Sequence, residues 1–131
     1  EPEVFQGDLR THYFYTMPLP TKIEKQVFEE VTLWMVKNRP EEDIRPKLDI
    51  GYRVDNQDLY LYEIRPAFHN PKESRHYDIA RATYVKSRQC WKIYWKRADL
   101  KWHGYEPRLF VKDVGQFLQE VENDPYGCFY G

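Results

Sequence analysis

Residues 77–105 read YDIARATYVKSRQCWKIYWKRADLKWHGY, and this stretch decides the fold. Residues typical of strands fill 77–86, 90–96 and 100–105, and short polar turns at 87–89 and 97–99 separate them. Connections this short cannot make a parallel crossover, which needs about a dozen residues. The stretch therefore predicts a three-stranded antiparallel meander.

Side-chain alternation along the meander separates two faces. Trp91, Ile93 and Trp95 share one face of the middle strand. A two-residue turn at 97–98 would pair Ile93 with Trp102, which places a third indole on the same face. We interpret this face as the core side, covered by helices.

The opposite face of the meander is predicted to be cationic and aromatic. Residues 75–108 carry nine Lys and Arg against three Asp and Glu, although the whole chain has a net charge of -1. Cations pair with phosphates, and aromatic rings stack on bases. A solvated face, whose cations keep its strands from pairing with other molecules, is the alternative interpretation. The outward residues are Arg81, Thr83, Lys92, Tyr94, Lys96, Lys101, His103 and Tyr105, and the expected contacts to an anionic ligand or nucleic acid come from Arg81, Lys92, Tyr94, Lys101, His103 and Tyr105.

The rest of the chain adds two helices and a hairpin. Apolar residues at three- and four-residue spacing predict a helix over about 21–38, where Thr21 and Glu24 have capping-box spacing, and a second helix over about 111–123. Strands at 48–54 and 59–65 flank a turn at 55–57. The prediction is an α+β fold: a five-stranded, largely antiparallel sheet, built from a hairpin and a three-stranded meander, with an N-terminal and a C-terminal helix packed on one face.

Length and composition agree with one domain. The chain has 131 residues, and its aromatic content of 17% excludes a globally disordered chain. We set residues 1–20 apart as an N-terminal segment and assign 21–131 to a single α+β domain. No apolar run approaches the ~20 residues of a membrane span, and no secretory leader is visible. We expect a cytoplasmic protein with no membrane partner.

A carboxylate pair on the first hairpin supports a second functional hypothesis. A three-residue turn at 55–57 would place Asp49 opposite Glu63, with Arg65 two residues beyond it. Two carboxylates on adjacent strands can hold Mg²⁺ and support phosphodiester cleavage. Such sites usually carry Lys where this chain has Arg65, and a ladder of ion pairs is the simpler interpretation.

Cysteine and histidine spacing gives no further site. Cys90 and Cys128 lack a second Cys or a His two to four positions away, so we expect two reduced thiols and no zinc. No phosphate-binding glycine loop occurs either. We therefore expect no cofactor and no resident metal.

Four motifs in fixed order resemble a known family. They are LYEIRP at 61–66, WKIYW at 91–95, LKWHGY at 100–105 and DPYGCFYG at 124–131. Together they resemble the bacterial domain-of-unknown-function family numbered three thousand and twenty-four, over roughly residues 45–131; Tyr130 departs from the Trp expected there. The resemblance implies a small bacterial cytoplasmic protein and brings no activity, cofactor or site residue.

Three functions remain open from the sequence. The favoured one is a non-enzymatic binding module that uses the basic aromatic face. The second is a metal-dependent phosphodiesterase, with Asp49, Glu63 and Arg65 as its catalytic residues. The third is a homodimer in which the exposed sheet face or a sheet edge pairs with itself.

Overall fold

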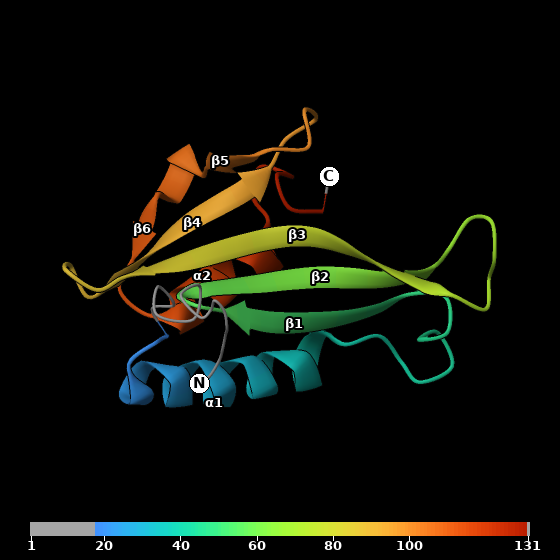
Figure 1. Ribbon diagram of the computed structural model, residues 1–131, viewed down its shortest axis with the longest axis horizontal. Helices are drawn as coiled ribbons and strands as arrows, with labels where there is room; N and C mark the ends of the chain where they lie inside the picture. Colours follow the sequence, from blue (N-terminus) through green and yellow to red (C-terminus); the bar gives the residue numbers. More distant parts are fainter. Residues whose placement is uncertain (1–17, 131) are drawn as a thin grey trace, which may run out of the picture.

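The computed structural model describes residues 18–130 and has the α+β fold that the sequence predicts (Figure 1). A five-stranded antiparallel meander runs in chain order from β1 to β5, and a short sixth strand pairs with β4. The strands are β1 (Asp49–Asp55), β2 (Asp58–Pro66), β3 (Ser74–Val85), β4 (Cys90–Lys96), β5 (Trp102–Gly104) and β6 (Phe110–Val111). A 3₁₀ turn, η2 (Glu106–Arg108), separates the last two strands.

Helix α1 (Thr21–Asn38) has the predicted bounds, but the predicted capping box is wrong. Pro20 precedes the helix, so Thr21 is its first residue, and no side chain caps the amino end. Proline is favoured around a helix start because it has no N–H to leave unpaired and its φ angle is already fixed. The helix ends where Arg39 turns to an extended conformation before Pro40.

Helix α2 (Val114–Asn123) starts three residues later than the sequence predicts. Val111 lies in β6, where it pairs with Trp91. The Asp113 carboxylate then accepts a hydrogen bond of 2.9 Å from the Gln116 N–H, which begins the helix. Asp124, in the left-handed conformation with φ of 39°, ends it.

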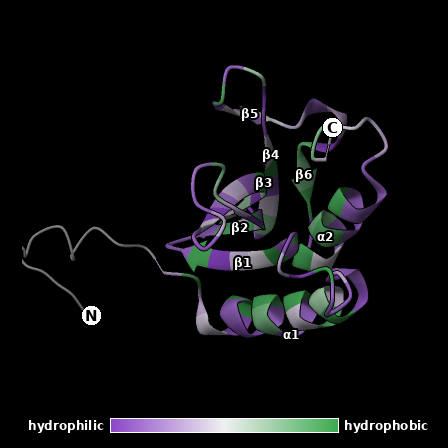
Figure 2. Cartoon of the chain, turned by 90° about the vertical axis from the view of Figure 1, so that its right-hand side faces the viewer, coloured by the Kyte–Doolittle hydropathy of each residue, from purple (hydrophilic) through white to green (hydrophobic). Residues whose placement is uncertain are grey.

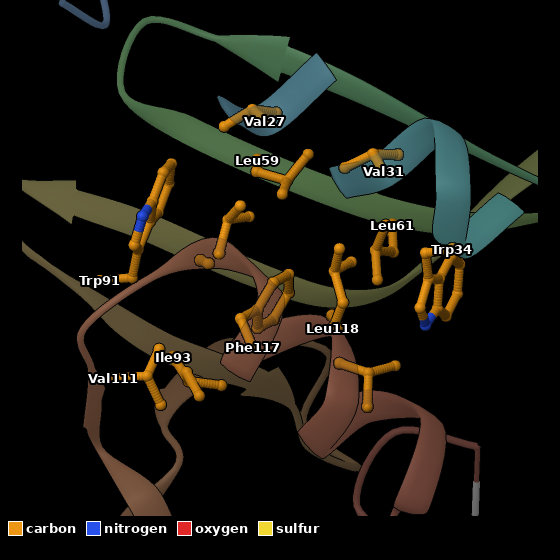
Figure 3. Close-up of a cluster of buried hydrophobic side chains, with 14 of the residues drawn as sticks. Val27, Val31, Trp34, Leu59, Leu61, Trp91, Ile93, Val111, Phe117 and Leu118 are labelled. Atoms are coloured by element: carbon orange, nitrogen blue, oxygen red, sulfur yellow. The ribbon is translucent and has the colours of Figure 1, made fainter. Parts of the chain in front are cut away.

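Both helices cover the same face of the sheet and share one core (Figure 3). In Figure 2, α1 lies below β1, and α2 lies beside β4 and β6. Both helices carry hydrophobic and hydrophilic segments in that view, and their buried residues recur at three- and four-residue spacing, which makes one apolar face on each helix. The core contacts include Val27 and Val31 of α1, Leu59 and Leu61 of β2, Trp91 and Ile93 of β4, and Phe117 and Leu118 of α2. No described helix covers the opposite face.

We predict that Phe117→Ala lowers the free energy of unfolding by about 3–5 kcal/mol, because Phe117 is fully buried between α2 and the sheet. Phe28→Ala is the matched control: Phe28 is 61% exposed, so its removal should change the free energy by less than about 0.5 kcal/mol. Urea unfolding followed by tryptophan fluorescence measures both variants. Equal losses in the two variants would contradict the assigned core.

Candidate functional site: the open face of the sheet

The face of the sheet that the helices leave uncovered carries a row of alternating arginines and tyrosines. Register pairs Arg53 with Tyr60, Tyr60 with Arg81, and Arg81 with Tyr94 across β1 to β4. Tyr94 in turn pairs with Gly104 of β5. We call this face the open face and these five residues the central row. Paired residues project to the same side of a sheet, so the four side chains stand next to one another.

Cations and rings of the open face contact one another directly. The Arg53 guanidinium lies 4.1 Å from the Tyr60 ring centroid. Arg81 lies 4.5 Å from the Tyr94 centroid and 5.9 Å from those of Tyr60 and Trp102. The Tyr60 and Trp102 rings are themselves 5.9 Å apart. These are cation–π distances, so the face is an ordered layer of alternating charge and aromatic surface.

Two carboxylates hold the arginines of the central row. Asp78 accepts two hydrogen bonds from Arg53, at 2.8 and 3.1 Å, and lies 3.9 Å from Lys96. Hydrogen bonding to Asp78 raises the pKa of Arg53 above its ordinary value, so its charge is fixed. Asp58 accepts a bond of 3.4 Å from Arg81. Each arginine of the row is therefore oriented and partly neutralised.

Two other cations of the open face have no carboxylate within 4.0 Å among residues 18–130. Lys92 Nζ lies 5.0 Å from the Tyr94 ring centroid. Arg88 lies 4.1 Å from the ring of Phe110, which pairs with Lys92 and so shares its face. Both belong to the β4–β6 side of the sheet, where positive charge is left uncompensated.

Three of the predicted ligand-binding residues lie where the sequence places them. Arg81, Lys92 and Tyr94 project from β3 and β4 onto the open face, because Ala82 pairs with Ile93 on the core side. The predicted outward residues Thr83 and Lys96 lie there as well. Lys101 lies in the exposed loop before β5, where its N–H donates to Asp99 at 2.9 Å.

The predicted orientation of β5 is wrong, and it changes the site. Lys96 pairs with Trp102 and Trp95 pairs with His103, so Trp102 lies on the open face and His103 on the other. The turn that connects β4 to β5 spans 97–101, rather than two residues, and Leu100 adopts a φ of 63° in it. A register shift by an odd number of residues exchanges the two faces of a strand.

Tyr105 is buried and does not point outward as predicted. Its side chain is 0% exposed, and its ring lies 4.9 Å from that of Phe129, which is itself buried. Its hydroxyl donates a hydrogen bond of 2.7 Å to Glu120 of α2. Tyr105 therefore connects the end of the sheet to α2 and the C-terminal turn.

Sequence reasoning missed Arg53, Tyr60 and Trp102 as members of the open face. The predicted register of the first hairpin was wrong because the turn has two residues, Asn56 and Gln57, where three were predicted. Asn56 has a φ of 55°, the left-handed conformation that tight hairpin turns require and that asparagine tolerates. The sequence signal for this two-residue turn was the asparagine at position 56.

The predicted carboxylate pair does not form. Asp49 pairs with Ile64 and Ile50 pairs with Glu63, so the two carboxylates lie on opposite faces of the hairpin. Asp49 instead accepts two hydrogen bonds from Arg39, at 2.9 and 2.7 Å, which lower the pKa of its carboxyl group. Residues 18–130 contain no group of three or more His, Cys, Asp or Glu that could hold a metal.

Glu63 forms an ion pair, and the two cysteines are at least partly buried. Glu63 accepts a bond of 3.2 Å from Arg65, its neighbour two residues on. Cys90 is buried and Cys128 half-buried, and both are free thiols. Burial raises the pKa of Cys128, which disfavours the thiolate that nucleophilic chemistry needs. No helix in residues 18–130 is long and apolar enough to cross a membrane.

The family model described as a domain of unknown function, DUF3024, matches residues 19–131. The chain belongs to the DUF3024 family. The match starts at Leu19, two residues before α1, and so spans both helices and every strand of the described chain. The predicted resemblance is confirmed, and the DUF3024 match extends further toward the N-terminus than residue 45. No curated protein and no solved structure matches the chain.

We predict that Tyr105→Phe lowers the free energy of unfolding by about 1.5–3 kcal/mol at neutral pH, because it removes a hydrogen bond to a carboxylate. Burial, followed by the bond to Glu120, raises the pKa of Tyr105 above its ordinary value of about 10. A raised pKa in the folded state means that its stabilising effect is complete below pH ~10 and is lost above it. The deficit of Tyr105→Phe should therefore shrink as pH rises above about 10.

Tyr126→Phe is the control, because Tyr126 is 68% exposed. It should leave the free energy of unfolding within about 0.5 kcal/mol of the wild type. Denaturant unfolding at several pH values from neutral to alkaline measures all three proteins. A Tyr105→Phe deficit that stays constant across this range would contradict the assigned pKa shift.

Proposed function

We propose that the chain is a binding module whose open face binds single-stranded nucleic acid. The observation that carries the proposal is the central row, in which arginine and tyrosine alternate across four adjacent strands. Exposed aromatic faces stack on unpaired bases at about 1–3 kcal/mol per base, and cations beside them pair with the phosphates. Both kinds of contact are supplied at neighbouring positions of one surface.

The shape of the surface favours a single strand over a duplex. Tyr60, Tyr94 and Trp102 are half-buried in the sheet surface, so their rings reach only bases that are splayed out from a helix. No described helix or hairpin projects from this face to enter a groove. Sequence-independent binding is expected, because stacking and phosphate contacts carry little base information.

Binding, rather than catalysis, is the proposal because the carboxylates proposed for a phosphodiesterase are on opposite faces of the first hairpin. The aspartates of the open face are engaged with Arg53 and Arg81. These aspartates hold the two arginines in orientation beside the aromatic rings, which is a positioning role.

We predict that Tyr94→Leu weakens binding of a fluorescent oligothymidylate of about 12 nucleotides by roughly 1–3 kcal/mol, because one stacking surface is lost. Lys92→Gln should reduce the slope of log affinity against log salt by about 0.7, the value for one phosphate contact on a single strand. Tyr77→Leu is the control: Tyr77 is 48% exposed but pairs with Glu63 on the other face. Fluorescence anisotropy across a salt series measures all variants.

Absence of salt-dependent binding to single strands would overturn the proposal and leave a solvated face. Equal effects of Tyr94→Leu and Tyr77→Leu would place the binding elsewhere on the protein. Tighter binding of a duplex than of either of its strands would overturn the preference for unpaired bases.

Association of two copies is a second candidate, favoured by an apolar groove beside β1. β1 ends the strand path, and the groove between it and α1, about 630 Å³ in volume, is lined in part by Phe28, Tyr52 and Val54. If two copies meet there, sedimentation should be concentration-dependent in the wild type and monomeric for Val54→Lys. A monomer at every concentration would exclude this dimer.

A further inference from the structure

A hollow of about 520 Å³ lies at the β5 edge of the sheet, where chain segments from β4, β5, η2 and the C-terminal turn meet. Its lining combines apolar and charged groups. Trp95, Leu109, Tyr126 and Cys128 give it apolar walls, and Lys92, Arg97 and His103 give it nitrogen-bearing side chains. Glu106 is the one carboxylate among the described lining residues. The hollow therefore suits a compact anion attached to an apolar or aromatic body.

Two of the three nitrogen-bearing side chains of the hollow, Arg97 and Lys92, have no carboxylate partner in the described chain, whereas His103 is paired with Asp99. The Arg97 guanidinium lies 5.5 Å from the centroid of the Trp95 ring, and within residues 18–130 it has no carboxylate within 4.0 Å. His103 Nε2 lies 2.8 Å from the Asp99 carboxylate, which restrains its ring. Lys92 also has no carboxylate partner in the described chain. Two permanent positive charges, on Arg97 and Lys92, thus line the hollow with one carboxylate, Glu106, and the Asp99 carboxylate lies beside His103.

Lys92 joins this hollow to the open face. Its Cε lies 3.9 Å from the position that a Cβ of Gly104 would occupy, so the lysine stem covers the last residue of the central row. Its Nζ is beside Tyr94, the preceding member of that row. Gly104 and Lys92 also line the hollow. The central row therefore leads to the hollow after a span of roughly 19 Å, at the usual spacing of about 4.8 Å between strands.

We propose that the hollow binds the terminal phosphate of the single strand that crosses the open face, with Arg97 and Lys92 as its cationic contacts. This inference rests on the proposed function and adds a preference for a phosphorylated end. A terminal phosphate monoester carries a charge of about -1.5 to -2 at neutral pH and three acceptor oxygens, whereas an internal diester carries one negative charge. Because Trp95 pairs with His103 on the face opposite to the central row, the end of the strand passes around the β5 edge, and its terminal sugar or base then lies against Trp95 and Tyr126.

The test compares oligothymidylates of about 12 nucleotides that carry a 5′-phosphate, a 3′-phosphate or no terminal phosphate. Fluorescence anisotropy at one fixed salt concentration gives the affinities. We expect one of the two phosphorylated forms to bind at least fivefold more tightly than the unphosphorylated one. Arg97→Gln should abolish that difference and leave the affinity for the unphosphorylated strand within about twofold.

Arg75→Gln is the matched control. Arg75 is exposed near the start of β3 and pairs with Arg65, next to the His76–Ile64 pair, so it lies on the face opposite to the central row. This variant should keep the preference for the phosphorylated end. An unfolding curve shows whether the Arg97→Gln variant is folded. If it is folded, loss of the preference reports a lost contact rather than a lost fold.

The outcomes separate the two proposals. Equal affinity for all three oligonucleotides, with binding retained, overturns the terminal-phosphate site and leaves the open face as the binding surface. No binding of any oligonucleotide overturns the proposed function itself. Displacement of the unphosphorylated strand by inorganic phosphate alone would show a general anion site and would also overturn the preference for a strand end.

Discussion

Burial of Leu59 and Leu61 in β2, and of Trp91 and Ile93 in β4, against the two helices is the constraint on which the site depends. Each such side chain contributes about 1.5–3 kcal/mol when it leaves water, whereas an exposed cation–π contact contributes about 0.5–1 kcal/mol. The core therefore sets which faces of β3 and β4 are buried, and the hairpin turns set the register of β1, β2 and β5 against them. Once both are set, side-chain alternation brings Arg, Tyr, Arg and Tyr from four strands into one row.

The contacts within the open face bear directly on how a ligand could bind there. Arg53 covers part of the Tyr60 ring, and Arg81 lies among three rings. A base that stacks on this surface therefore meets guanidinium planes as well as aromatic ones, and arginine also stacks on bases. Because Asp58 and Asp78 already restrain the arginines, the proposed binding would cost little of their side-chain entropy.

The sequence predicted the fold and the central strands well because their two faces differ strongly in composition. Ala80 and Ala82 alternate with Arg81 on β3, and Trp91 and Ile93 alternate with Lys92 on β4, so only one orientation buries the apolar set. At 59–64, LYLYEI, both faces are largely apolar, and the hydrophobic pattern alone cannot choose between leucine and tyrosine as the buried set. There the turn decides, and its length depends on the left-handed conformation of Asn56.

The predicted orientation of β5, at the other side of the site, was wrong for the same reason. Trp102, His103 and Tyr105 are all large and amphipathic, so either parity can be accommodated by the neighbouring strand. The choice is made by the connection over 97–101, where Leu100 adopts a backbone conformation that branched and bulky residues rarely take. Leu100 is 77% exposed, so packing of its side chain does not explain this conformation. The turn is held by its own hydrogen bonds, from the Leu100 N–H to the Arg97 carbonyl at 2.8 Å and from the Arg97 N–H to the Lys101 carbonyl at 3.1 Å, and residue preference gives no warning of it. The hollow at the β5 edge was equally beyond sequence reasoning, since its lining comes from four separate segments.

Charge is distributed unevenly across the open face: positive charge is paired with carboxylates on one side of the sheet and is uncompensated on the other. On the β1–β3 side, Arg53 and Arg81 each contact an aspartate, so their fields are short-range. On the β4–β6 side, Lys92 and Arg88 have no carboxylate within 4.0 Å in the described chain. In the proposed function, a polyanion is therefore attracted first to the β4–β6 side, and its bases then extend over the rings toward β2. In this proposal the cations that attract the ligand and the rings that stack on it are on adjoining parts of one sheet, and Lys92, 5.0 Å from the Tyr94 ring centroid, connects them.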